Sequence, residues 1–166
     1  MSLVLEILTF TALILQTFLD GWIFMAPAPA AGVWATTTAT VVQVIDGDTV
    51  MVKLDGGTGT VRVRYIGIDT PEQYPEQTCG AASATKRNRE LVEGKTVTLV
   101  PDREGYDRYG RRLAYVFVGT EFVNEVLVTE GQARVLTVPP NTRYADEFER
   151  KATSARSKGW GVWQCM

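Results

Sequence analysis

Two neighbouring segments of the chain alternate hydrophobic and polar residues, which is the pattern of β-strands with one buried face. The segments cover residues 49–54 and 60–66, and Asp55, Gly56 and Gly57 between them supply a turn that tolerates positive φ angles. The hydrophobic positions are Val50, Val52 and Leu54 in the first segment and Val61, Val63 and Tyr65 in the second. The pattern therefore predicts an antiparallel hairpin.

The same kind of pattern predicts further strands at residues 41–45, 96–100 and 113–118. A short extended segment follows at residues 133–137. We expect residues 160–163 to fold back over the domain.

Helical spacing of hydrophobic residues predicts three helices. The first covers residues 80–92 and the second residues 121–130, while the last begins after a cap at Asn141 or Thr142 and ends at Gly159. The positions expected to face the core are Ala82, Thr85, Asn88 and Leu91 or Val92 in the first helix, Phe122, Val123, Val126 and Leu127 in the second, and Tyr144 or Ala145, Phe148, Ala152 and Ala155 in the last.

The beginning of the chain differs from the rest in composition. Residues 3–19 form an apolar run, and small residues and prolines dominate residues 25–32. This resembles a secretory signal peptide with a cleavage site at residues 28–30, although no Lys or Arg precedes the run and Glu6 lies within it.

We interpret residues 1–30 as a signal peptide or membrane anchor, residues 31–40 as a linker and residues 41–166 as the folded domain. The protein would then be secreted, or anchored to a membrane outside the cytoplasm. Three alternatives remain for the apolar segment: an uncleaved anchor, an amphipathic helix packing on another surface, or an upstream extension with the true start at Met25.

The predicted hairpin brings together acidic residues that are distant in the sequence. Asp48 begins the first strand and Asp69 follows the second, so antiparallel pairing places their carboxylates near each other. Oxygen ligands that converge in this way suit Ca²⁺ or Mg²⁺. Arg64 lies between them in the second strand, and Glu72 follows a rigid Thr-Pro pair, where it is suited to activate water. The pattern indicates a cation site beside a phosphate site.

Each fragment of this site also has a purely structural explanation. Asp-Gly-Asp is a common turn sequence, and Thr70 and Pro71 fit the N-cap and first position of a helix. Arg62 shares a strand face with Arg64, so at least one of them can be an ordinary solvated charge. The combination at this spacing favours a functional site.

Composition narrows the available chemistry. The 166 residues, 45% of them hydrophobic and 22% charged, are enough for one globular domain with a core. The chain has no histidine, which excludes His-based catalysis and the usual zinc sites. Its net charge of −2 means that nucleic-acid binding would require a local basic patch. Hydrolysis would therefore depend on carboxylates, arginines and an oxygen-ligated metal.

A loop at residues 101–112 supplies local positive charge. Its arginines are Arg103, Arg108, Arg111 and Arg112. Tyr106 and Tyr109 are suited to stack on bases or sugars. The competing explanation is that the arginines pair with Asp102, Glu104 and Asp107 inside the loop, and the two explanations are compatible.

Three motifs together resemble the thermonuclease (staphylococcal nuclease-like, micrococcal nuclease) family. They are DGDTV at residues 46–50, VRVRYIGIDTPE at 61–72 and DRYGRRLAY at 107–115, and the resemblance extends over residues 39–163. It implies an α+β fold, an OB-type five-stranded β-barrel with three α-helices. It also implies a Ca²⁺-dependent endonuclease (phosphodiesterase) that hydrolyses DNA and RNA to 3′-phosphate products. Single-stranded substrates, a monomeric state and no obligate protein partner are expected.

The resemblance implies roles for individual residues. The metal ligands would be Asp48, Asp69 and the backbone carbonyl of Thr70. The catalytic residues would be Arg64, Glu72 and Arg111, and the substrate-binding residues Arg108 and Tyr109. Glu72 would orient or deprotonate the attacking water, and the arginines would bind the phosphodiester through a planar fork that lysine cannot copy.

The chain departs from the type member of that family in two places. Residues 73–78 are short and lack lysine where the type member has a lysine-rich loop, and Thr137 and Pro139 occupy the positions of two tyrosines. The main alternative function is a non-catalytic OB-type module that binds nucleic acid or protein, and a third is a metal-stabilised structural domain. Retention of every matched acidic and arginine position favours the enzyme.

The chain contains two cysteines, Cys79 and Cys165, without the short spacing of a zinc or redox motif. In an exported protein they would form a disulfide that ties the C-terminal tail to the start of the first helix. The alternative is a pair of unpaired thiols.

Overall fold

The computed structural model describes residues 35–72 and 78–165. The expected signal peptide or anchor at residues 1–30 lies outside the described residues, as does the first part of the expected linker. None of the described helices is both long and apolar enough to span a bilayer.

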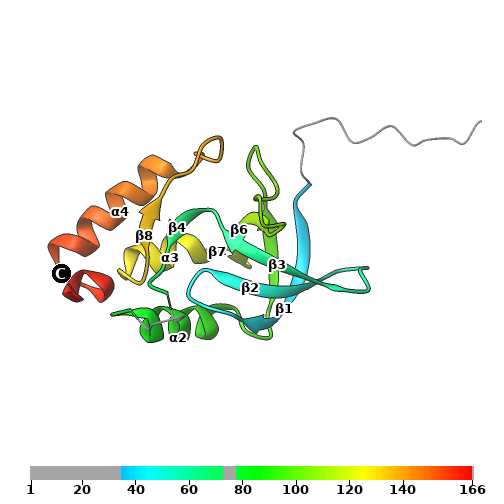
Figure 1. Ribbon diagram of the computed structural model, residues 1–166, viewed down its shortest axis with the longest axis horizontal. Coiled ribbons are helices and arrows are strands. Elements are labelled where there is room, and N and C mark those ends of the chain that lie inside the picture. Colours follow the sequence, from blue (N-terminus) through cyan, green and yellow to red (C-terminus); the bar gives the residue numbers. More distant parts are fainter. Residues whose placement is uncertain (1–34, 73–77, 166) are drawn as a thin grey trace, which may run out of the picture. The chain divides into compact units, whose positions relative to one another are not determined.

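Five strands close into a barrel (Figure 1). They are β1 (Thr37–Val44), β2 (Thr49–Leu54), β3 (Thr60–Tyr65), β5 (Thr96–Val100) and β6 (Arg112–Val118). Antiparallel pairing joins β3, β2, β1, β5 and β6 in that order, and parallel pairing between β3 and β6 closes the sheet. Over the described residues the structure thus confirms an α+β, OB-type five-stranded barrel accompanied by three α-helices.

The remaining elements lie mainly to one side of the barrel in Figure 1. They are the helices α2 (Ala81–Val92), α3 (Val123–Thr129) and α4 (Ala145–Ser157), the 3₁₀ helix η1 (Gly161–Cys165), and the short strands β4 (Gly67–Asp69), β7 (Glu121–Phe122) and β8 (Arg134–Leu136). Helix α3 packs against α4, and β4 pairs with β8 to form a small separate sheet. The segment that carries the expected site therefore leaves the barrel at β3 and continues into this second layer.

The hairpin predicted from the alternating pattern is confirmed. Strands β2 and β3 are antiparallel, with Thr49 opposite Arg64. Val50, Val52 and Val63 are completely buried, as the period of two requires. The site is thus attached to a completely buried part of the barrel.

The prediction of a linker at residues 31–40 is wrong for residues 37–40. Strand β1 begins at Thr37, and Ala39 is completely buried. Residues 37–40 pair with residues 96–99 of β5. A stretch rich in Thr and Ala has no strong pattern of its own, so this distant pairing decides its structure.

Two helix details also differ from expectation. Ala82 is exposed, whereas Ala81 and Ala84 face the core. Helix α4 begins at Ala145, and Asn141 does not cap it: the Asn141 side chain accepts from the Glu104 backbone N at 2.8 Å and donates to the Glu104 carbonyl at 2.9 Å. The asparagine therefore joins two loops instead of starting a helix.

Candidate active site

The turn Asp46-Gly47-Asp48 joins β1 to β2 and lies against Thr70. Asp48 is 1% exposed, and its Oδ2 atom accepts hydrogen bonds from the backbone N of Thr70 at 2.8 Å and from its hydroxyl at 3.0 Å. A Cβ atom on Gly47 would lie 2.7 Å from the Thr70 side chain, so glycine is required for this close approach. The turn therefore ties the start of β2 to the segment that follows β4.

Arg64 of β3 binds both carboxylates of the expected cation site. The guanidinium forms ion pairs with Asp48 and with Asp69, and 2.6 Å separates its Nη2 atom from Oδ1 of Asp69. The side chain of Arg64 is 14% exposed and that of Asp48 is 1% exposed, so water screens this pair poorly. The structure thus brings Asp48, Arg64 and Asp69 together.

The two carboxylates that bind Arg64 carry oxygen atoms of the kind that a hard cation binds. Asp48 and Asp69 each direct Oδ1 at the same guanidinium, so their charges converge on one position. Oxygen ligands of this kind are those that Ca²⁺ prefers. Across residues 35–72 and 78–165, no group of three or more His, Cys, Asp or Glu side chains is arranged to hold a metal. A cation here would therefore need a backbone carbonyl, such as that of Thr70, and water to complete its coordination.

The loop between β5 and β6 holds Arg111 through Asp107. The Asp107 carboxylate accepts hydrogen bonds from the backbone N of Arg111 at 2.9 Å, from its Nε at 2.7 Å and from the backbone N of Tyr109 at 2.9 Å. Burial opposes ionisation of Asp107, but these hydrogen bonds together outweigh it and hold the pKa of Asp107 below its usual value. Because Asp107 binds Arg111 through Nε, both Nη groups of Arg111 are left available as donors.

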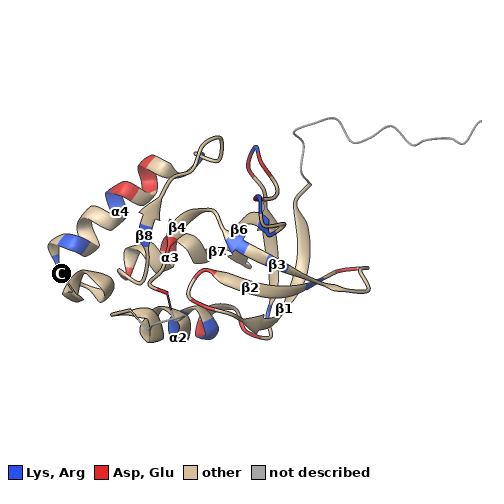
Figure 2. Ribbon diagram, in the orientation of Figure 1, with Lys and Arg blue, Asp and Glu red and all other residues tan. Residues whose placement is uncertain are grey.

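Arg64 and Arg111 line one cleft of about 550 Å³. Arg108 and Tyr109 line the same cleft, and Tyr109 is 67% exposed. Arg62, on the same strand as Arg64, borders an adjoining hollow together with Tyr109 and Arg111. Figure 2 shows basic positions in blue on β3 and on the loop before β6. These residues give the cleft a local positive charge, although the chain as a whole has a net charge of −2.

The expected pairing inside the loop holds only in part. Asp107 pairs with Arg111, but Asp102 pairs with Arg143 and accepts a hydrogen bond from the hydroxyl of Tyr115. Arg112 is nearly buried and donates to the carbonyl of Ala35 at 3.3 Å. It therefore supports the barrel and does not face the cleft.

Glu72 borders a second hollow, of about 390 Å³, which Asp69 and Thr70 also line. Its side chain is exposed, and it makes no hydrogen bond or ion pair within the described part of the chain. The structure thus places Glu72 beside Asp69 but shows no contact between its carboxylate and Arg64 or Arg111.

Asn88 of α2 is a site residue that the sequence did not reveal. It is completely buried, donates to the Asp46 carbonyl at 2.9 Å and accepts from the Tyr65 hydroxyl at 3.0 Å. Burial raises the pKa of Asp46, although the nearby Arg64 charge opposes this. Burial also raises the pKa of Tyr65. The sequence feature that could have identified Asn88 is an amide side chain at a core-facing helix position, where apolar residues are usual.

Comparison with known proteins identifies relatives of the chain. Residues 62–165 match the family model described as staphylococcal nuclease homologue. The chain is 41% identical over 126 residues to a thermonuclease of Staphylococcus intermedius, covering 74% of this chain and 73% of that protein. It is 39% identical over 130 residues to a thermonuclease of Staphylococcus hyicus, covering 76% and 75%.

A third relative is considerably longer. The SPbeta prophage-derived endonuclease YokF of Bacillus subtilis is 41% identical over 126 residues, which is 73% of this chain but 42% of that protein. The chain therefore spans less than half the length of this relative.

The closed barrel, the carboxylates gathered on Arg64 and these similarities define the class of protein as a nuclease. The chain belongs to the family of staphylococcal nuclease homologues.

Proposed function

We propose that the chain is a Ca²⁺-dependent endonuclease that hydrolyses phosphodiester bonds in DNA and RNA. The observation that carries the proposal is that Arg64, bound to Asp48 and Asp69, lines the same cleft as Arg111. A cation ligand set then lies beside two guanidinium groups, as stabilisation of charge on a phosphoryl group requires. The names of the relatives, thermonuclease and endonuclease, support the same reaction.

Each side chain has its own role in the proposed reaction. Glu72 orients the attacking water and accepts its proton. Arg64 and Arg111 hydrogen-bond the non-bridging oxygens and stabilise the charge that grows as phosphorus becomes five-coordinate. Asp48, Asp69 and the Thr70 carbonyl are the groups that would hold Ca²⁺, which would supply Lewis-acid polarisation of the phosphate. Cleavage of the P–O5′ bond leaves a 3′-phosphate.

Glu72 is suited to this role although it touches neither arginine. Its carboxylate is exposed and has no ion pair among the described residues, so rotation about its side-chain torsions can direct it towards a bound phosphate.

The cleft supports a preference for single strands. The exposed ring of Tyr109 lies 4.8 Å from the Arg108 guanidinium, and such a pair can stack on an unpaired base. Leu136 and Val138, which are 45% and 57% exposed, line the same cleft and offer apolar contact to a base or sugar.

We also propose that the enzyme acts outside the cytoplasm, either secreted or membrane-anchored. The Cys79–Cys165 disulfide supports this, because such bonds persist in oxidising compartments. N-terminal sequencing of protein from the producing cells tests the cleavage step. A mature chain that begins near residue 31 is expected after cleavage, whereas a retained apolar segment would indicate an anchor.

The activity is tested with labelled single-stranded DNA and RNA in Ca²⁺, with EGTA as the control. We expect cleavage with Ca²⁺, none with EGTA, and products whose 3′ ends carry phosphate by mass spectrometry. Binding without cleavage would instead favour the non-catalytic module.

A further inference from the structure

The disulfide between Cys79 and Cys165 joins the segment that follows Glu72 to the C-terminal helix η1. The two cysteines are 86 positions apart, and both border the hollow that Glu72 also lines. The proposed cleavage chemistry uses no cysteine. The bond therefore lies beside the proposed catalytic carboxylate without taking part in the reaction.

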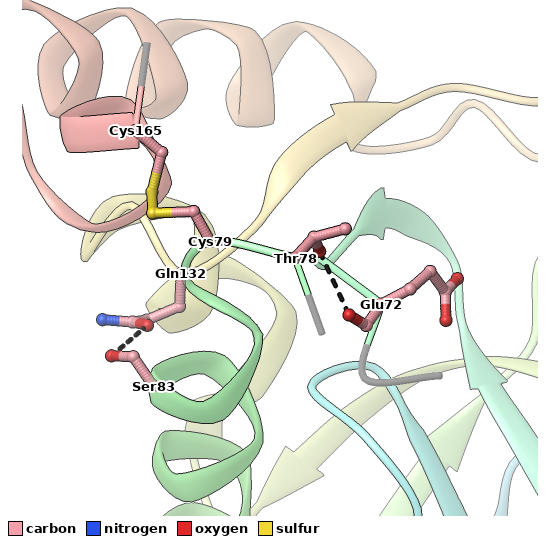
Figure 3. The surroundings of a disulfide bond; sticks show 6 residues. All are labelled: Glu72, Thr78, Cys79, Ser83, Gln132 and Cys165. Atoms are coloured by element: carbon pink, nitrogen blue, oxygen red, sulfur yellow. Dashed lines mark hydrogen bonds between the residues drawn. A yellow bond between two sulfur atoms is a disulfide. The ribbon is translucent and has the colours of Figure 1, made fainter. Parts of the chain in front are cut away.

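Thr78 connects this disulfide to Glu72. It precedes Cys79 directly, and its backbone N and its hydroxyl both donate to the Glu72 carbonyl, at 3.0 and 3.1 Å. Figure 3 shows Thr78 between the disulfide and Glu72, whose carboxylate points away from the sulfur atoms. The backbone at Glu72 is thus held by a residue whose own position depends on Cys79.

Helix η1 gives the disulfide a fixed point of attachment. Val162 is completely buried, and its backbone N donates to the Gly131 carbonyl at 2.8 Å. A Cβ atom on Gly161 would lie 2.1 Å from that carbonyl oxygen, so the two glycines allow the backbones to touch. A Cβ atom on Gly80 would lie 3.2 Å from the Val162 side chain. Cys165 therefore belongs to a tightly packed segment.

Glu72 has few other constraints. Arg64 and Arg111 are each oriented by a carboxylate, whereas the Glu72 side chain has no partner within the described residues. Its position therefore depends on its backbone, which Pro71 restricts on one side and Thr78 on the other. A displacement of about 1 Å in an active site can cost about 100-fold in rate.

We propose that the Cys79–Cys165 disulfide is a positioning element for Glu72 that acts through Thr78. The proposal rests on the proposed catalytic role of Glu72. When both cysteines are thiols, the ion pairs of Arg64 remain, because none of them involves the disulfide. The hold of Thr78 on the Glu72 backbone is weakened, because Thr78 directly precedes Cys79, so the site is assembled but turns over slowly.

The activity of the enzyme then depends on whether its compartment allows the disulfide to form. The two thiols give two electrons and two protons to a disulfide-containing oxidant, which becomes a dithiol. The enzyme reaches full activity in an oxidising compartment and remains slow in a reducing one.

The test compares wild type with Cys79→Ser/Cys165→Ser, each with Glu72 and with Glu72→Gln. We measure kcat and KM on single-stranded DNA with Ca²⁺, well below the Tm of every protein, because loss of a disulfide also lowers Tm. With Glu72 present, kcat should fall at least about tenfold while KM changes less than about twofold. With Glu72→Gln, the residual rate should not change further, because the group being positioned is gone.

Two further variants separate positioning from general stability. Ser83 donates to Gln132 at 2.9 Å and so tethers the same end of α2 without touching Thr78 (Figure 3). Ser83→Ala should therefore leave kcat unchanged. Thr78→Val removes one hydrogen bond to Glu72 and should lower kcat about threefold, and Thr78→Ser should restore it.

An equal loss of kcat in both Glu72 backgrounds, or no loss with Glu72 present, overturns the proposal. If the double cysteine variant does not fold, Thr78→Val and Thr78→Ser become the test. An unchanged kcat in Thr78→Val then overturns the proposal. Failure of the proposed function would look different. The wild-type enzyme, with its disulfide intact, would then not cleave, or would cleave equally well after Glu72→Gln.

Discussion

The arginine-lined cleft and the hollow beside Glu72 are built in different ways. In the cleft, charged side chains orient one another over short distances. Arg64 binds Asp48 and Asp69, and Arg111 binds Asp107. These contacts both position the guanidinium groups and stabilise the fold, so the two effects are coupled.

In the hollow, positioning comes from the backbone. The side chain of Glu72 has no partner within the described residues, while Thr78 holds its carbonyl and the disulfide holds the neighbouring Cys79. The physical reason is that a general base needs its lone pairs free to accept a proton. On this side a change can therefore remove activity without affecting stability.

The largest difference between loss of activity and loss of stability is expected for Glu72→Gln. Glutamine keeps the shape of the side chain but does not accept a proton as a base, so kcat should fall about 10³-fold. Tm should stay within about 1 °C, because exposed side chains without contacts contribute little. Steady-state kinetics and calorimetry measure the two effects. Glu149→Gln, at an exposed position of α4, is the matched control and should change neither. A wild-type rate for Glu72→Gln would remove Glu72 from the mechanism.

In the cleft, Arg64→Ala should lower the stability of the protein strongly, unlike Glu72→Gln. It leaves the buried Asp48 without its counter-charge, and removing one partner of a buried pair costs about 3 kcal/mol of unfolding free energy. Urea denaturation with and without Ca²⁺ measures it. Ca²⁺ should stabilise the variant more than wild type, because a cation replaces the missing charge.

The control for Arg64→Ala is Arg89→Ala, which breaks an exposed pair with Glu93 and should cost less than about 1 kcal/mol. Equal stabilisation of Arg64→Ala and wild type by Ca²⁺ would contradict a cation site at Asp48 and Asp69.

Arg111→Lys tests geometry at constant charge. Lysine cannot form the planar fork, so kcat should fall about 100-fold. Arg103→Lys, at an exposed position of the same loop, is the control and should leave kcat unchanged. Similar rates for Arg111→Lys and wild type would show that charge alone is needed at this position.

Asp107→Asn should have the smallest effect, with a characteristic pH dependence. The pKa of Asp107 is lowered because hydrogen bonds from Arg111 and Tyr109 outweigh its burial, so ionised Asp107 stabilises the folded state. That contribution is present above the usual value of 3.8 and is lost as pH falls through the lowered value. The variant should be about 1 kcal/mol less stable at neutral pH.

Urea denaturation between neutral pH and pH 3 checks this sign, and the difference from wild type should shrink below the usual pKa. A difference that stays constant over this range would show that the Asp107 charge does not contribute.

Local patterns predicted the hairpin correctly because alternation and a glycine turn act over a few residues. They also predicted that Asp48 approaches Asp69, since antiparallel pairing follows from that turn. The same reasoning failed for residues 37–40, whose strand depends on β5, and for Asn141, whose side chain binds Glu104. In each failure a distant partner outweighed the local preference.

By itself the sequence determined which reactive groups are available: oxygen ligands and guanidinium groups, with no imidazole. It left open whether Cys79 and Cys165 pair, and it did not indicate that Asn88 holds the Asp46 turn. Only the tertiary structure decided these points and the placing of Arg64 between two carboxylates. Such contacts join residues far apart in the chain, and closure of the barrel, with the burial that accompanies it, is what brings them together.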